Sequence, residues 1–111
     1  MLWREFLLED PEIDVVGEAA DGIEAIAGVR DTRPDVLVLD LSMPRLDGLE
    51  VIKALRKEMP SVSIIVASGF TAARMAPLAL ELGASEYLEK GIAADTLRDA
   101  VRAAYNNSGV S

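Results

Sequence analysis

The most constraining feature of the chain is a run of four apolar residues that ends in a carboxylate. Residues Val36 to Leu39 are all valine or leucine, and Asp40 follows them directly. An unbroken apolar run of this length is typical of a strand that is buried on both faces, as in a parallel sheet. Because such a sheet must be covered by helices on both faces, the run predicts an α/β fold.

The rest of the chain alternates between short β-type runs and helical periodicity. Strands are predicted at 13–18, 63–67 and 86–89, in addition to 36–39. Helices are predicted at 2–10, 21–33, 49–59, 71–82 and 93–105. Helices between strands imply right-handed crossovers, so we expect a doubly wound parallel sheet with helices on both faces. We assign 1–105 to one domain and 106–111 to a flexible tail.

Composition excludes several classes of function. The formal net charge is −8, whereas a nucleic-acid-binding protein needs a surplus of basic groups. Without cysteine or histidine, the chain has no disulfide, no Ser/His or Cys/His catalysis and no imidazole-bound zinc. No apolar run is long enough to span a bilayer, so we expect a cytoplasmic protein without membrane contact.

Polar residues follow three of the predicted strands. They are Asp40 after 36–39, Ser68 after 63–67 and Lys90 after 86–89. In open α/β sheets, functional residues gather at the carboxyl ends of the strands. A carboxylate, a hydroxyl and an ammonium at one edge form a constellation suited to phosphoryl transfer.

Several motifs have the order and spacing of a known family. They are Val36 to Pro44 with Leu46-Asp47-Gly48, Ile65 to Gly69, Leu82-Gly83-Ala84 and Tyr87 to Lys90. Over essentially its whole length, the chain resembles bacterial response-regulator receiver domains. The segment from Val15 to Gly22 resembles the branch that is usually attached to helix-turn-helix output domains. The resemblance implies a flavodoxin-like sheet.

The resemblance also implies a role for individual residues. Asp40 would accept a phosphoryl group from a sensor histidine kinase. Asp40 and the backbone carbonyl of Ser42 would bind Mg²⁺, Ser68 and Lys90 would contact the phosphate, and Tyr87 would be the switch aromatic. A downstream effector or output domain would read the change, and a homodimer is a further expected assembly. By itself, Tyr87 also fits a plain strand aromatic, and Lys90 fits a solvated lysine.

The chain departs from the receiver pattern at its beginning. Receivers carry two acidic Mg²⁺ ligands after a first strand, and both would align upstream of Met1. Either Met1 is an internal methionine of a longer reading frame, or the chain is a degenerate receiver. We expect 13–18 to pair directly with 36–39, or another chain to fill the gap, because unpaired buried backbone groups are costly.

Two other functions are compatible with the sequence. A receiver that lacks its acidic pair would act only as a protein-interaction module. A haloacid-dehalogenase-type hydrolase would also use an aspartate nucleophile, but it usually carries a second aspartate where this chain has Ser42. We also expect Trp3 and Phe6 to belong to the core, and the acidic residues Glu5, Glu9, Asp10 and Glu12 to be solvated surface.

Overall fold

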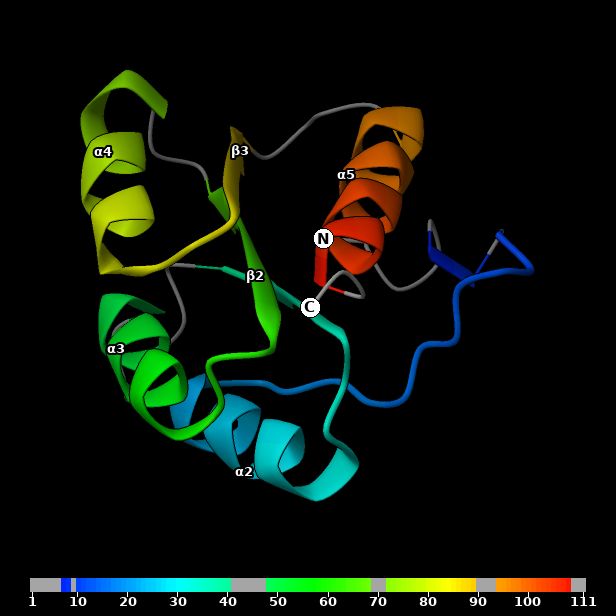
Figure 1. Ribbon diagram of the computed structural model, residues 1–111, viewed down its shortest axis with the longest axis horizontal. Helices are drawn as coiled ribbons and strands as arrows, with labels where there is room; N and C mark the ends of the chain where they lie inside the picture. The colour runs from blue at the N-terminus through cyan, green and yellow to red at the C-terminus, as the bar shows by residue number, and fades with distance from the viewer. Residues whose placement is uncertain (1–6, 9, 41–47, 69–71, 90–93, 109–111) are drawn as a thin grey trace.

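The computed structural model describes residues 7–8, 10–40, 48–68, 72–89 and 94–108. Within them, three strands form one parallel sheet in the order β1-β2-β3 (Figure 1). The strands are β1 (Val36–Leu39), β2 (Ser63–Ser68) and β3 (Glu86–Glu89). These bounds confirm three of the four predicted strands, and the parallel α/β class is confirmed with them.

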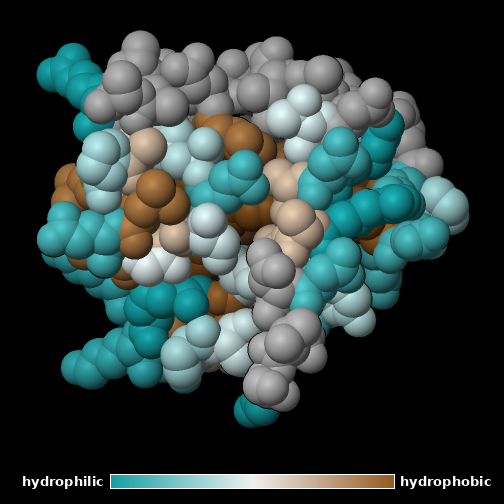
Figure 2. All heavy atoms as spheres, turned by 45° about the horizontal axis from the view of Figure 1, so that its top comes forward, coloured by the Kyte–Doolittle hydropathy of each residue, from teal (hydrophilic) through white to brown (hydrophobic). Residues whose placement is uncertain are grey.

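In the described part of the chain, four helices cover the two faces of the sheet. They are α2 (Gly22–Thr32), α3 (Gly48–Glu58), α4 (Ala72–Leu82) and α5 (Ala94–Ser108). Figure 1 shows α2, α3 and α4 on one side of the sheet and α5 on the other. On the face that Figure 2 presents, apolar residues are interspersed with hydrophilic ones.

The strands divide their side chains between two hydrophobic clusters. Ile64 and Val66 of β2 belong to the cluster with α2, α3 and α4, whereas Ile65 belongs to the cluster with α5. Successive side chains of a strand point to opposite faces, so a strand buried on both faces must be apolar throughout. The unbroken apolar runs of the sequence are explained by this arrangement.

The helix boundaries follow from local chemistry. The Asp21 carboxylate accepts a hydrogen bond from Glu24 N–H at 2.9 Å and thereby caps the first turn of α2. Arg33 ends α2 in a left-handed conformation with φ 47°, and Gly83 follows α4 with φ 117°. The last helix was predicted to end at Tyr105, but α5 continues to Ser108.

The predicted strand at 13–18 is wrong. Residues 13–19 have no regular secondary structure, and the described sheet has three strands, so 13–18 does not pair directly with β1. Ile13 instead packs with the α5 cluster, and Val16 is half exposed. Figure 1 shows this segment running from the α5 side of the molecule to the start of α2. Its β-type composition is not sufficient for a strand, because a strand also needs a neighbour to complete its hydrogen bonds.

Candidate functional site

The carboxyl edge of the sheet holds two of the predicted site residues. Asp40 directly follows β1, whose last residue, Leu39, is buried. Leu39 pairs with Val66, and β2 continues for two residues to Ser68. Because the strands are parallel, Asp40 and the end of β2 lie at the same edge, as predicted.

The end of β3 reaches the same edge. Glu89, the last residue of β3, is the register partner of Ser68. Lys90 follows Glu89 in the sequence and lies outside the described residues, as does Ser42. Their predicted roles therefore stay predictions. The structure does show that the carboxyl ends of β1, β2 and β3 lie at one edge of the sheet.

Tyr87 lies in the core next to this edge. It pairs with Val66 and is 9% exposed, within the cluster that also contains residues of α3 and α4. A buried tyrosine at this place can contact both the sheet and α4, so its burial is compatible with the plain core interpretation and with the switch role.

The described residues do not form a site for a divalent cation. Mg²⁺ requires near-octahedral oxygen coordination, usually with one or two carboxylates. In the part of the chain that the structure describes, no three acidic, histidine or cysteine side chains are grouped so that they could hold a metal ion. Of the two predicted ligands, only Asp40 lies within that part.

A cavity of about 960 Å³ begins at Asp40 and extends along β1. Its wall is formed by residues 12–20, by one side of α2, by the whole of β1 and by the last turns of α5. No motif in the sequence predicts this cavity.

The turn before this cavity is anchored by an ion pair between buried Asp10 and half-exposed Arg102. The Asp10 carboxylate, 6% exposed as a residue, accepts hydrogen bonds from Glu12 N–H at 2.9 Å and from Arg102 Nε at 2.9 Å. The Glu12 N–H and the Arg102 guanidinium hold the pKa of Asp10 below 3.8, against burial, which raises it. The expectation that Asp10 is solvated surface is therefore wrong. Trp3 and Phe6 lie outside the described residues.

None of the helices in the described segments combines the length and the apolar character needed to cross a lipid bilayer.

Comparison with known proteins agrees with this geometry. A family model described as the response regulator receiver domain matches residues 1–102. The crystal structure of the response regulator domain of Thermotoga maritima CheB superposes with a TM-score of 0.86 at 30% identity. That match covers 94% of this chain and 85% of the other.

Two curated relatives are considerably longer than this chain. The protein-glutamate methylesterase/protein-glutamine glutaminase of Pyrococcus abyssi is 43% identical over 89 residues, which are 78% of this chain and 24% of that protein. The response regulator protein VraR of Staphylococcus saprophyticus is 30% identical over 105 residues, 95% of this chain and 50% of that protein. The chain thus spans half or less of the length of these relatives.

Proposed function

The chain belongs to the response regulator receiver domain family, and from that premise we propose that it is the phosphoacceptor module of a two-component phosphorelay. Asp40 is the residue that a partner histidine kinase phosphorylates. The observation that carries this proposal is the position of Asp40 directly after β1, whose last residue, Leu39, is buried, and on the same edge as the end of β2.

The chemistry proposed for Asp40 is a direct displacement. A carboxylate oxygen attacks phosphorus and forms an O–P bond, while the P–N bond of the donor phosphohistidine breaks and the electron pair returns to the imidazole. The added charge on Asp40 requires a nearby cation and a hydrogen-bond donor. We assign these roles to Lys90 and Ser68, and the role of the reorienting aromatic to Tyr87. The protein has no enzymatic activity of its own beyond transfer to, and loss from, Asp40.

Receiver domains generally bind Mg²⁺ and interact with histidine kinases and effector domains. For this chain, Asp40 and the carbonyl of Ser42 are the proposed ligands, but the described residues do not complete a site. The relevant partners are a sensor kinase and an effector or output domain that reads the state of Asp40.

The alternative proposal, made from the sequence, is a receiver that binds partners through its surface without being phosphorylated. The two functions share the fold and differ in whether Asp40 gains a phosphoryl group.

One experiment separates the two functions. The chain is incubated with acetyl phosphate and Mg²⁺ and its intact mass is measured. We expect a gain of one phosphoryl group that disappears in Asp40→Asn. Asp35→Asn, at the other end of β1 and exposed, is the control variant and should retain the gain.

The alternative outcomes are equally clear. Unchanged mass in the wild-type chain, with binding to a kinase retained, would establish the interaction-only function. A mass gain that persists in Asp40→Asn would show that another residue is the acceptor.

A further inference from the structure

A second cavity lies at the amino edge of the sheet. The connections 33–35 and 59–62 lead into β1 and β2, whose strands begin side by side in the parallel sheet. Together with Tyr105, in the last turns of α5, they line a cavity of about 310 Å³. Because parallel strands begin at one edge and end at the other, this amino-edge cavity lies opposite to the edge that holds Asp40.

Hydrogen bonds between residues distant in sequence hold the walls of the amino-edge cavity in place. Ser63 N–H donates to the Asp35 carbonyl at 3.0 Å and so joins the two connections. The Ser63 hydroxyl donates to the Ala104 carbonyl at 3.3 Å, which ties the last turns of α5 to the start of β2. The Arg56 guanidinium holds the connection 59–62 through two of its carbonyls. A cavity whose walls are already fixed loses little conformational entropy when it binds a ligand.

Two opposite charges line this cavity without pairing with each other. Arg33 and Asp35 are exposed and lie on either side of Pro34. Within the described residues, no salt bridge or hydrogen bond involves the side chain of either. Arg30 and Arg102, in contrast, are each bound to a carboxylate. The charges of the cavity are therefore complementary to a ligand that carries both signs.

An apolar surface accompanies these charges in the lining of the cavity. It is formed by Pro34, Met59, Val62 and the ring of Tyr105, and Val62 is buried. The volume of the cavity is at the lower end of the range for ligand sites, about 300–1,000 Å³. A ligand that fits is therefore small and carries a compact apolar group beside its two charges.

We propose that the amino-edge cavity binds a small zwitterion of the α-amino-acid class with an aliphatic side chain. The Arg33 guanidinium binds the carboxylate of the ligand, and the Asp35 carboxylate binds its ammonium group. The aliphatic group of the ligand packs on the apolar surface. This site lies at the opposite edge of the sheet from Asp40, so binding does not depend on phosphorylation.

A titration with L-leucine tests the proposal. L-leucine is added to the isotopically labelled full chain, and its binding is followed by the amide resonances. We expect saturable shifts at Asp35, Val62 and Tyr105 and none at Ser68, at the opposite edge of the sheet. Isoamylamine lacks the carboxylate and isocaproate lacks the ammonium group, while both retain the aliphatic group. Each should bind at least about tenfold more weakly than L-leucine, because each leaves one charge of the site unpaired.

Variants of the two charged residues locate the ligand in the cavity. Arg33→Gln and Asp35→Asn should each weaken binding of L-leucine at least about tenfold. Arg74→Gln and Asp31→Asn are the matched controls, because they change the net charge equally at exposed positions that do not line the cavity. Both controls should leave binding unchanged. In Arg33→Gln, L-leucine should also lose its advantage over isoamylamine, since the partner of its carboxylate is gone.

Three results would overturn the proposal. Spectra without saturable shifts up to about 10 mM L-leucine would show that the cavity does not bind this class of ligand. Equal binding of L-leucine and either analogue would show that the site does not recognise both charges. Binding that survives Arg33→Gln and Asp35→Asn would place the ligand elsewhere. None of these measurements involves phosphoryl transfer, so their failure leaves the proposed role of Asp40 untouched.

Discussion

Asp10 shows how much a single carboxylate can contribute at the start of the chain. It holds Glu12 N–H on one oxygen and two nitrogens of Arg102 on the other, which ties the turn after Leu8 to α5 across 92 positions of sequence. These partners stabilise the ionised form of Asp10 and lower its pKa from the ordinary value of 3.8. The stability that this pair provides therefore depends on pH.

The pH dependence can be measured with Asp10→Asn. Because the folded-state pKa is lowered, the ionised carboxylate stabilises the fold above the unfolded value of 3.8, and this contribution is lost as pH falls below it. We expect the wild-type chain to be more stable than Asp10→Asn at neutral pH and the gap to narrow as pH falls below about 3.8. Asp31→Asn, at an exposed position of α2, is the charge-matched control in urea unfolding. A gap that stays constant with pH would contradict the argument.

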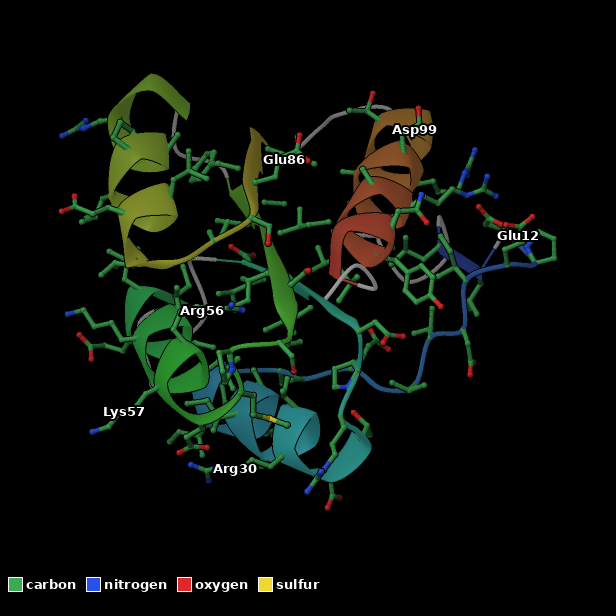
Figure 3. The ribbon with its side chains drawn as sticks, in the orientation of Figure 1. Glu12, Arg30, Arg56, Lys57, Glu86 and Asp99 are labelled. Carbon is green, nitrogen blue, oxygen red and sulfur yellow. The ribbon has the colours of Figure 1, made fainter. Side chains whose placement is uncertain are left out.

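Arg56 and Gly83 form a second local arrangement that the sequence does not reveal. Arg56 leaves α3 toward β2, while the neighbouring Lys57 points away from the molecule (Figure 3). The Arg56 guanidinium donates hydrogen bonds to the carbonyls of Pro60, at 2.8 Å, and Val62, and burial lowers its pKa. Its side chain also lies against Gly83, where a Cβ would come within 2.3 Å of Arg56 Cγ.

Gly83→Ala should therefore be clearly destabilising. The positive φ of 117° is unfavourable for alanine, and the close approach of Arg56 adds a steric cost. We expect a loss of about 1–3 kcal/mol in the free energy of unfolding, measured with urea. Gly28→Ala is the control in the opposite direction and should gain about 0.5–1 kcal/mol, because Gly28 lies inside α2 with open space around it. Equal effects at the two positions would contradict this account.

At the scale of elements, α2 has a complete set of end signals. Asp21 caps its first turn, Glu24 lies near the positive end of the helix dipole, and Arg33 closes the last turn by donating its N–H to Val29 O at 2.9 Å. All of these interactions join residues within four positions of one another. Local sequence was therefore sufficient to predict where this helix begins and ends.

Asp21→Ala tests the contribution of the cap. Removing the carboxylate leaves Glu24 N–H without its acceptor, and we expect a loss of about 0.5–2 kcal/mol. Asp21→Asn retains an oxygen acceptor and should recover most of that loss in the same unfolding experiment. If Asn is as damaging as Ala, the cap is not the source of the stability.

At the scale of the whole molecule, stability depends on the two clusters that flank the sheet. The α5 cluster contains Ile65, Leu97, Ala100, Val101 and Ala104, of which Leu97 and Ile65 are fully buried. Of the four described helices, α5 alone lies on that face of the sheet (Figure 1). Loss of its packing would therefore expose the sheet to water.

Leu97→Ala tests how much the α5 cluster contributes to stability. Truncation of a fully buried leucine costs about 2–5 kcal/mol. Leu80→Ala on α4 is the control, because Leu80 is 46% exposed and a surface change of this kind should stay within about 0.5 kcal/mol. Thermal unfolding of both variants provides the comparison, and similar losses would contradict the assignment of the core.

The sequence predicted most of the fold because most of its signals are local or periodic. The strands predicted at 36–39, 63–67 and 86–89 and the helix ends at Asp21 and Gly83 each correspond to an observed feature. The position of Asp40 and Ser68 at one edge could also be predicted, since parallel strands end at the same edge of a sheet, whereas the roles of these residues stay predictions.

Only the tertiary structure decided the conformation of the segment 13–18 and the burial of Asp10. Residues 13–18 have the composition of a strand, but pairing depends on a neighbour that composition does not specify. Asp10 was assigned to the surface because its partner, Arg102, is distant in sequence. Hydrophobic periodicity and local backbone preferences depend on residues that are close in sequence, so the sequence alone reveals them. Strand pairing, side-chain burial and cavities depend on which residues distant in sequence come into contact, so only the tertiary structure reveals them.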